Sequence, residues 1–376
     1  MKKSLLTLAL GSLCASSAFA QTSVTLYGIA DAAVHYTTNA DASNHGQLAL
    51  DNGAVTQSRW GLKGAEALGN NLKAIFQLEN GYNLDNGTMS SSGQLFNRQA
   101  YVGLAGDFGA VKLGRQYTEG FNLFGDFDPL TIGNWNGNSW MYYSFTQLRR
   151  NNVISYSGSF SGLDVGLSYG FGETPGSFTR ASGSGAGTNS PYFGARLAYN
   201  WGPFGVGGVY QEIRDGNGNK QQMWGATGKY TVGPAKLFLG YLGAKDHTGQ
   251  MDAVLNNALV VTTTRWTIPT TTGTAAADAN PRKDTLGFAG VTYNVTPALA
   301  LTGAFYGDFV EGKNGIAGSA GKGRRYTAAF IAEYSLSKRT QVYGAADWNK
   351  VSGATEMELP GRGNQTSFGA GVRHIF

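Results

Sequence analysis

The chain has 376 residues, of which 41% are hydrophobic and 14% charged, with a formal net charge of +5 at pH 7. This small, dispersed positive charge does not favour nucleic acid as a partner, and a single cysteine, Cys14, excludes a disulfide framework. The 56 glycines are about twice the usual share, which suits a β-rich protein with many turns. Beyond the N-terminus, no apolar run approaches the ~18 residues of a membrane helix. The composition therefore leaves a soluble β protein or a membrane barrel.

The first segment, residues 1–20, has the features of a secretory signal peptide. Two lysines precede an apolar run, and Ala18-Phe19-Ala20 fits the small-residue cleavage motif. We expect Gln21 to begin the mature domain, residues 21–376. Cys14 would be removed with the signal, so the mature chain is expected to lack a thiol nucleophile and a thiolate metal site.

The rest of the chain contains many segments of about ten residues that alternate between apolar and small or polar side chains, the period of a β-strand. In LDVGLSYGF, residues 163–171, Leu163 and Val165 share one face while Asp164 and Gly166 share the other. Similar segments lie near 24–36, 58–64, 72–82, 222–232, 299–308, 326–336 and 340–348. Counting segments between turn signals gives about 16 strands, a number that encloses an aqueous channel in a barrel.

Three features favour a membrane barrel over a soluble sandwich. Aromatic residues such as Tyr82 and Trp348 fall at the ends of apolar faces, as interfacial girdles require. Connections alternate between tight turns, such as 202–203, and long polar stretches, such as 172–190. Charged residues stand at mid-strand on the other face, where a dry core would not tolerate them unpaired but a water-filled lumen would. The sequence thus predicts an all-β fold, a 16-stranded antiparallel transmembrane β-barrel of the outer-membrane kind.

The chain ends on GVRHIF, residues 371–376, which alternates as a final strand. In a closed barrel the last strand must pair with the first. We therefore expect the ring of Phe376 to lie at the periplasmic interface.

Several stretches resemble the trimeric general porins of Gram-negative bacteria, of the β-proteobacterial type. They are SVTLYGIAD at 23–31, SRWGLKGAEALGNNLKAIFQLENG at 58–81, FNRQAYVGLAG at 96–106, FGAVKLGRQY at 108–117 and GVRHIF. The resemblance implies an outer-membrane homotrimer, passive diffusion of small hydrophilic solutes and ions, and a third loop folded into the pore. It also implies that the barrel-assembly machinery recognises the terminal Phe376. Outer-membrane lipid and lipopolysaccharide would surround the barrel, and no cofactor is expected.

The stretch 118–148 favours an inward third loop on its own composition. It is rich in Phe, Trp and Tyr, which would be poorly accommodated in bulk water, and it carries Asp126 and Asp128 near its middle. Folding against the inner wall would bury the rings and narrow the lumen. The alternative is packing over the rim or against a neighbouring subunit.

Basic side chains on the wall are the candidate selectivity residues. Arg59 and Lys63 alternate with Trp60 and Leu62, so both are expected to face the lumen. The resemblance implies that Arg59, Arg98 and one arginine opening the sixth strand line a pore constriction. Arg149 or Arg150 fills the last role, and the spacing does not decide between them.

Two arginines fit the alternation poorly. Arg98 shares a face with Ala100 and Val102, and Arg115 shares one with the apolar Leu113. A lipid-facing arginine costs least near an interface. We therefore expect Arg115 near the outer rim, bonded to a loop of a neighbouring subunit.

The expected selectivity follows from charge. Clustered guanidinium groups would create a positive field across the pore, with Asp126 and Asp128 as the opposite pole. We expect a mild preference for anions that weakens as salt rises. The alternative is that these arginines are solvated strand-end charges without influence on flux.

Other function classes fit less well. The four histidines, His35, His45, His247 and His374, stand in no readable catalytic motif, so an enzyme is not expected. Two alternatives share the barrel fold. One is a solute-specific channel for phosphate or another small anion. The other is an adhesin-type barrel that acts through long loops such as 260–281.

Overall fold

The computed structural model describes residues 23–131, 133, 135, 137–174, 177, 189–256, 281–312, 321–361 and 363–376. The expected signal peptide lies outside these residues, so its removal and the start of the mature domain at Gln21 stay predictions. Most of the described chain is β-strand. None of the described helices is long and apolar enough to cross a membrane.

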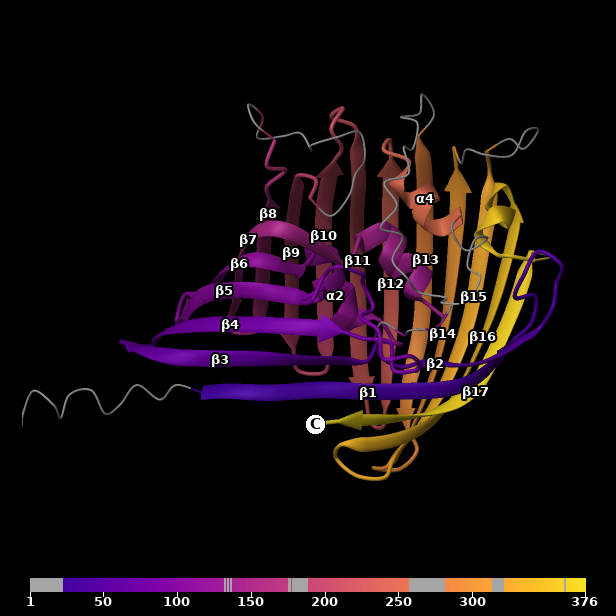
Figure 1. Cartoon of the computed structure of the whole chain (residues 1–376), viewed down its shortest axis with the longest axis horizontal. Coiled ribbons are helices and arrows are strands. Elements are labelled where there is room, and N and C mark those ends of the chain that lie inside the picture. Colours follow the sequence, from indigo (N-terminus) through magenta and orange to yellow (C-terminus); the bar gives the residue numbers. More distant parts are fainter. Residues whose placement is uncertain are drawn as a thin grey trace, which may run out of the picture.

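Within the described residues, seventeen strands form one sheet of antiparallel neighbours. Their bounds are β1 (Ser23–Thr37), β2 (Gln47–Asn52), β3 (Arg59–Gly69), β4 (Leu72–Gly81), β5 (Gln99–Gly106), β6 (Gly109–Tyr117), β7 (Arg149–Phe160), β8 (Leu163–Gly170), β9 (Tyr192–Trp201), β10 (Phe204–Arg214), β11 (Lys220–Val232), β12 (Ala235–Asp246), β13 (Arg282–Asn294), β14 (Leu299–Glu311), β15 (Gly323–Ser335), β16 (Thr340–Gly353) and β17 (Asn364–Ile375). The last strand returns to the first, with Ile29 opposite Ile375. Figure 1 shows β1 and β17 side by side, so the sheet closes into a barrel.

Strands β2 and β3 occupy a single position in the barrel wall. β3 pairs with the first half of β1, Ile29 opposite Arg59, and β2 pairs with the second half, Ala32 opposite Asn52. The second half of β1 also pairs with β17, so β2 lies on the other edge of β1, in line with β3. The seventeen strands therefore fill sixteen positions, which confirms the predicted 16-stranded antiparallel barrel.

Tight turns join the strands at one end of the barrel. In the turn between β3 and β4, Asn70 and Asn71 have φ of 49° and 61°, the left-handed values that two-residue hairpins require. Connections at the opposite end are longer, such as 118–148 between β6 and β7. In outer-membrane barrels, short turns mark the periplasmic end and long loops the extracellular end.

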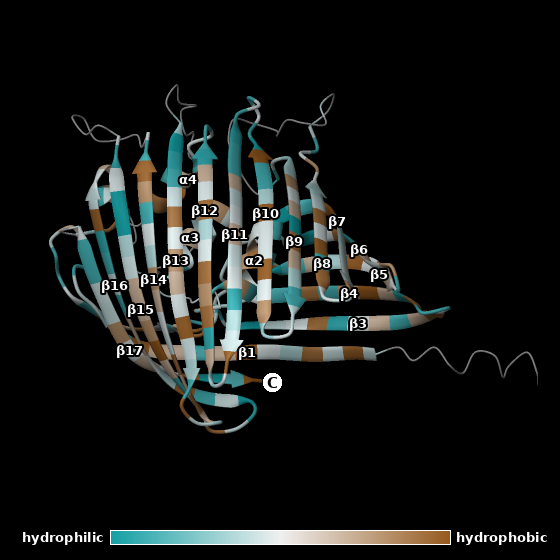
Figure 2. Cartoon of the chain, turned by 180° about the vertical axis from the view of Figure 1, so that it is seen from behind, coloured by the Kyte–Doolittle hydropathy of each residue, from teal (hydrophilic) through white to brown (hydrophobic). Residues whose placement is uncertain are grey.

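The outward face of the wall is apolar. Along β12, Leu237, Leu239 and Tyr241 are each at least 43% exposed, whereas the alternating Phe238 and Leu242 are buried. Figure 2 shows hydrophobic and hydrophilic positions alternating along the strands. A band of exposed apolar side chains that continues from strand to strand suits lipid rather than water.

Segment 118–148 packs on the inward face of the wall. It contains α2 (Glu119–Phe127), α3 (Ser139–Met141) and the π-helix η2 (Tyr142–Thr146). Thr118 caps α2, because its hydroxyl accepts a hydrogen bond of 3.2 Å from the backbone N–H of Phe121. Helix α2 contacts β8, β9, β10 and β11, and Figure 1 shows it between the near and far walls.

Two wall glycines make room for α2. A Cβ atom added at Gly207 would lie 2.5 Å from Cδ1 of Leu123, and one at Gly225 would lie 2.7 Å from Cζ of Phe124. Both distances are too short for a real side chain, so the helix depends on these glycines for its close approach. The apolar core of the molecule lies at this contact. Its loop residues include Leu123, Phe124, Phe127, Met141, Tyr142 and Phe145.

Candidate pore constriction

Three of the predicted arginines meet around Tyr117, the last residue of β6. Arg98 Nη2 donates to the Tyr117 hydroxyl at 2.7 Å, and Arg149 Nη2 donates to the same oxygen at 3.3 Å. The guanidinium of Arg149 also lies 4.7 Å from the centre of the Tyr117 ring. Arg59 is near enough for its charge to interact with those of Arg98 and Arg149. We call Arg59, Arg98 and Arg149 the arginine cluster.

A carboxylate that the sequence analysis did not single out sits against this cluster. Glu79 Oε1 pairs with Arg98 Nε at 2.7 Å, and its Oε2 accepts from the Tyr27 hydroxyl at 2.9 Å. Gln57 supplies two further acceptors, its side-chain oxygen to Arg98 at 2.6 Å and its backbone oxygen to Arg59 at 3.1 Å. Glu79 therefore compensates part of a cluster that keeps a positive excess.

Arg98 enters the cluster because it does not belong to a strand. β5 begins one residue later, at Gln99, and the backbone N–H of Arg98 bonds to the Glu79 carbonyl at 3.1 Å. The alternation that set Arg98 on a face with Ala100 therefore does not apply to it. Its side chain is buried and turned towards Tyr117 and Glu79.

Arg149 and Arg150 diverge because they are consecutive residues of β7, where successive side chains point to opposite faces of the sheet. The π-helix η2 ends at Thr146, and Gln147 and Leu148 follow with φ of 54° and 41° before β7 begins. Arg149 is opposite Tyr117 in the register of β6 and β7 and bonds to it, whereas Arg150 Nη2 donates to the backbone oxygen of Ser190 at 2.8 Å. Arg149 is thus the one that joins the cluster.

Lys63 lies two residues beyond Gly61 in β3, on the same alternating face as Arg59. It is exposed, and its ammonium is 5.3 Å from the centre of the Tyr27 ring. Tyr27 in turn bonds to Glu79, so Lys63 lies beside the arginine cluster rather than inside it.

The two predicted loop aspartates have different surroundings. Asp126 is 61% exposed and pairs with Lys229 of β11, Nζ to Oδ2, at 2.6 Å. Asp128 is 1% exposed and accepts from the Tyr306 hydroxyl at 2.8 Å and from Asn138 Nδ2 at 2.7 Å. Burial raises the pKa of Asp128 to about 7. Asp128 therefore anchors the loop to β14 and is not the exposed negative pole that the sequence analysis expected. Asp126 remains as the exposed negative charge of the loop.

Another anchor holds the start of the loop. Glu119 Oε2 pairs with Arg196 of β9 at 2.9 Å, and its other oxygen accepts from the hydroxyl of Ser168. The backbone N–H of Glu119 donates to the Tyr192 hydroxyl at 2.7 Å. None of these residues was singled out from the sequence, because they come from three separate elements, α2, β8 and β9, with no shared motif.

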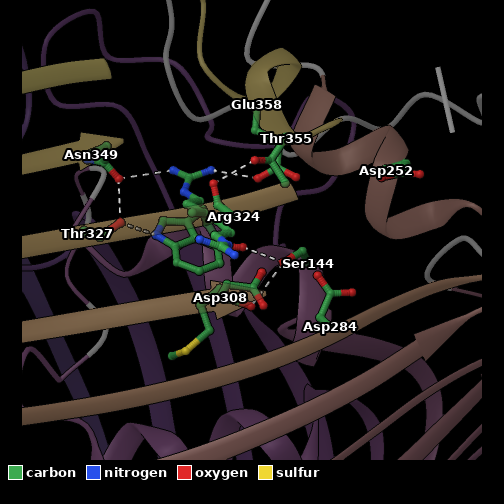
Figure 3. A network of polar contacts seen from close by, with 12 residues as sticks. Ser144, Asp252, Asp284, Asp308, Arg324, Thr327, Asn349, Thr355 and Glu358 are labelled. Carbon is green, nitrogen blue, oxygen red and sulfur yellow. Dashed lines mark hydrogen bonds and ion pairs between the residues drawn. The ribbon is translucent and has the colours of Figure 1, made fainter. Parts of the chain in front are cut away.

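A buried ionic network, shown in Figure 3, ties the extracellular loops to the wall. Arg282 of β13 pairs with Asp284 at 2.6 Å, with Asp252 at 2.7 Å and with Glu358 at 2.9 Å. Asp252 belongs to α4 (Gln250–Asn256) and Glu358 to the 3-10 helix η4 (Ala354–Glu358). The network thus joins two extracellular segments to one strand.

Arg325 extends this network to the third loop. It pairs with Glu358 at 3.4 Å and lies 4.4 Å from the centre of the Trp140 ring. Trp140 also donates its indole N–H to the Thr327 hydroxyl at 3.2 Å. Loop 118–148, α4 and η4 are therefore held to one another as well as to the wall.

Two further sequence expectations are resolved by contacts within the chain. Arg115 is 9% exposed and donates to the Asn97 carbonyl at 2.8 Å and to Asn151 at 2.5 Å, so its partners are internal rather than a neighbour's loop. The terminal Phe376 pairs with Gly28 of β1 through two backbone hydrogen bonds of 2.9 and 3.0 Å. Its ring is 43% exposed at the short-turn end of the barrel.

These features define a class of protein. A closed barrel with an apolar outer belt and a loop packed on its inner wall, beside an arginine cluster, is an outer-membrane channel. The described residues contain no group of acidic, histidine or cysteine side chains suited to a metal ion. The chain belongs to the Gram-negative porin family, whose model matches residues 6–354.

Individual relatives agree with this assignment. The chain is 31% identical to an outer membrane porin of Bordetella pertussis over 404 residues that span both chains completely. It is 30% identical to the major outer membrane protein P.IB of Neisseria gonorrhoeae, with 93% of each chain covered. An anion-selective porin from Comamonas acidovorans shares the fold, with a TM-score of 0.72 over 95% of this chain and all of that one, at 23% identity. The protein is an outer-membrane diffusion channel, and its relatives are channels rather than enzymes.

Proposed function

We propose that this channel favours small anions and that the arginine cluster sets the preference. The observation that carries the proposal is the imbalance at Tyr117, where Arg59, Arg98 and Arg149 gather around the single carboxylate of Glu79 among the described residues. Guanidinium groups stay charged at all relevant pH values. The excess charge would attract anions and repel cations that pass the loop.

The size and reach of the field follow from simple electrostatics. At an effective dielectric constant of about 20, two unit charges ~4 Å apart interact by about 4 kcal/mol. The Debye length is about 8 Å at physiological salt, so mobile ions screen the field appreciably within a pore. We therefore expect a modest anion preference that declines as salt rises.

The loop contributes less negative charge than its sequence suggests. Asp128 is buried in the contact with Tyr306, and Asp126 is paired with Lys229. The field across the lumen would then be set by the positive wall more than by a balanced pair of poles. This supports anion preference over a neutral, purely size-selective pore.

The test is the reversal potential of the purified protein in a planar bilayer under a KCl gradient. We expect an anion-selective potential that shrinks at high salt and falls further in the double variant R59Q/R149Q. The matched control is K338Q/R339Q, which removes two positive charges from the exposed short β15–β16 turn. A cation-selective wild type, or a double variant as selective as the wild type, would refute the role of the cluster. Small conductance blocked by one particular anion would instead favour a solute-specific channel.

We also propose that the channel catalyses no reaction and uses no cofactor. His45 pairs with Asp41 at 2.7 Å in an exposed loop, and His374 contacts the Thr340 hydroxyl at 3.0 Å at an exposed position of β17. Residues 260–280, on which an adhesin function would rest, lie outside the described residues. An assay of the purified protein on phospholipid and ester substrates should therefore show no turnover above a protein-free control.

A homotrimer is the assembly we propose. A related outer membrane protein of Vibrio cholerae is described as a trimer form. In this chain the outward face is not uniform. Aliphatic side chains dominate on β1, β5 and β6, whereas aromatic ones dominate on β9 to β16. The aliphatic set includes Val24, Leu26, Val102, Leu104 and Leu113, each at least 46% exposed. Contact between subunits would cover this sector, and native mass measurement of detergent-extracted protein tests it.

We further propose that Phe376 serves as the assembly signal. In the closed barrel Phe376 is 43% exposed, so it remains accessible at the rim. The variant F376S should reach the outer membrane in much smaller amounts, although the purified chain should still refold in detergent. Normal export of F376S would overturn this role.

A further inference from the structure

A row of lysine and tyrosine side chains crosses the wall next to the arginine cluster. The Tyr27 hydroxyl accepts a hydrogen bond from Gln77 Nε2 at 2.5 Å, and the Tyr101 hydroxyl donates to Gln77 Oε1 at 2.9 Å. The ammonium of Lys63 lies 5.3 Å from the centre of the Tyr27 ring, and that of Lys112 lies 5.4 Å from the centre of the Tyr101 ring. We call Lys63, Tyr27, Gln77, Tyr101 and Lys112 the lysine–tyrosine row.

Strand alternation places this row on the lumen face of the wall. Leu26, Val102 and Leu113 are each at least 52% exposed on the outward face, and each is next in sequence to a member of the row. Because successive side chains of a strand point to opposite faces, the row members beside them point inward. The strands that carry the row, β1, β3, β4, β5 and β6, are successive neighbours in the barrel, and Figure 1 shows them side by side.

The row lies on the periplasmic side of the arginine cluster. Gln77 comes two residues before Glu79 in β4, and Lys63 is opposite Gln77 in the register of β3 and β4. Since β4 begins at the short-turn end and a strand rises about 3.4 Å per residue, the two levels are about 7 Å apart. An anion that has passed the cluster towards the periplasm therefore meets the row next, on the same wall.

Two glycines let members of the row lie close to the wall. A Cβ atom added at Gly61 would be 2.8 Å from the Tyr27 hydroxyl oxygen, and one at Gly103 would be 3.2 Å from Cγ of Lys112. A side chain at either position would push its neighbour towards the centre of the lumen. Tyr27 and Lys112 thus lie over these glycines, along the wall.

The two ammonium groups of the row pair with no carboxylate among the described residues. Glu119 carries a charge that reaches Lys112, yet its carboxylate is bonded to Arg196 at 2.9 Å. Glu79 is likewise bonded to Arg98 at 2.7 Å. The contacts of the ammonium groups with the tyrosine rings are weak, because both distances are near the ~6 Å limit of cation–π attraction. Both ammonium groups therefore keep donors for an anion from solution.

The tyrosine hydroxyls are occupied, so the rings offer flat apolar faces to a solute. Tyr27 donates to Glu79 and accepts from Gln77, and Tyr101 donates to Gln77. Both tyrosines are half-buried, which leaves part of each exposed to the lumen. An open ammonium beside such a ring is complementary to an anion that has a planar group of its own, because the charge can bind the ammonium while the two rings stack.

We propose that the lysine–tyrosine row binds aromatic carboxylates, small anions in which a carboxylate is attached to a planar ring, as they pass through the channel. The carboxylate accepts hydrogen bonds from Lys63 or Lys112, and the ring stacks on the neighbouring tyrosine. An inorganic anion of the same charge gains only the first of these contacts. The proposal rests on the anion preference proposed for the arginine cluster and names a class of solute that this preference serves.

The test is the block of the chloride current through single channels in a planar bilayer by benzoate, at a fixed KCl concentration. Benzoate is compared with cyclohexanecarboxylate, which has the same charge and a similar size but no planar ring, and with benzyl alcohol, which has the ring without the charge. We expect benzoate to half-block the wild type at a concentration about fivefold lower than cyclohexanecarboxylate does, the factor that one stacked aromatic pair supplies. Benzyl alcohol should not block.

Two double variants with matched controls test the place of binding. Y27L/Y101L removes both rings and should lose the fivefold preference for benzoate, whereas Y27F/Y101F, which also lacks both hydroxyls but keeps the rings, should retain it. K63Q/K112Q should weaken the block by benzoate at least tenfold, because a hydrogen bond to a charged group counts for about that factor. K338Q/R339Q removes two charges from the exposed β15–β16 turn and should be blocked like the wild type.

The outcomes also separate this proposal from the selectivity assigned to the arginine cluster. Equal block of the wild type by benzoate and cyclohexanecarboxylate, or a fivefold preference that persists in Y27L/Y101L, would overturn the lysine–tyrosine row as the site. R59Q/R149Q should keep the fivefold preference even though its reversal potential falls, and loss of the preference in that variant would place the binding at the cluster instead. Failure of the anion preference itself would appear in the reversal potential in KCl alone, where no aromatic solute is present.

Discussion

Arg98 and Glu79 form an ion pair of 2.7 Å whose side chains are 4% and 5% exposed, at the base of a cluster that holds two further arginines. The pair has two effects. It fixes the Arg98 guanidinium against the Tyr117 hydroxyl, and it cancels part of the charge of the cluster. The field that permeating ions meet is then set by the net charge of this group of side chains, which contains three cations and one anion.

Replacing Glu79 with glutamine should separate these two effects. We expect E79Q to be more anion-selective than the wild type, because the remaining guanidinium groups lose their counter-charge. We also expect a loss of about 3 kcal/mol in the free energy of unfolding, since breaking one partner of a buried pair leaves the other uncompensated. Reversal potential and thermal unfolding of the purified protein measure the two quantities. The control is E66Q, at an exposed position of β3, and unchanged selectivity in E79Q would contradict the account.

Asp128 should make the loop contact depend on pH. Its pKa is raised from 3.8 to about 7, so the folded state binds the proton more tightly than the unfolded state. Stability then falls as pH rises through the interval between those two values, and is greatest below it. We expect the thermal midpoint of the wild type to decrease from pH 5 to pH 8. The D128N variant should show a flatter profile, and a wild-type midpoint that rises across this interval would contradict the assignment.

The sequence predicts the barrel well because alternation and turn chemistry are local. Asn70 and Asn71 mark a turn, and Arg59 and Lys63 lie inside a regular strand, so their inward direction follows from the period of two. The prediction weakens wherever the chain leaves a strand. Arg98 precedes β5 by one residue, so the period of that strand does not place it. Arg149 begins β7, but the register of β6 and β7 shifts between Gly114 and Gln116, so the period of the rest of β7 does not extend back to it.

Long-range partners could not be predicted for a different reason. Glu79 reaches Arg98 across a connection between β4 and β5, and Glu358 reaches Arg282 across 76 residues of chain. Charge and spacing in the sequence carry no information about such pairs, because barrel closure brings them together. Asp128 shows the same limit, since its burial depends on Tyr306 of β14.

The close contact of α2 with the wall should be sensitive to one methyl group. A Cβ at position 207 would meet Leu123 at 2.5 Å, whereas a Cβ at position 208, on the other face of the same strand, has its nearest neighbour at 3.6 Å. We expect G207A to destabilise the protein by about 1–3 kcal/mol and to increase open-channel noise, because the added methyl group displaces α2 from its contact with the wall. G208A should behave like the wild type in both measurements. Equal behaviour of the two variants would show that α2 does not rest on this glycine.

The buried network of Figure 3 should control how firmly the extracellular loops are held. Glu358 bonds to Arg282 at 2.9 Å and to Arg325 at 3.4 Å, and it is 1% exposed. Removing its charge leaves two buried guanidinium groups short of a partner, so we expect E358Q to lose about 3–5 kcal/mol of stability. Glu356 belongs to the same short helix η4 but is exposed, which makes E356Q a matched control with little expected effect. Thermal unfolding measures the loss, and protease cleavage of the folded protein should become faster in the extracellular loops of E358Q alone. If E358Q and E356Q were equally stable and equally resistant, η4 would not be held by this network.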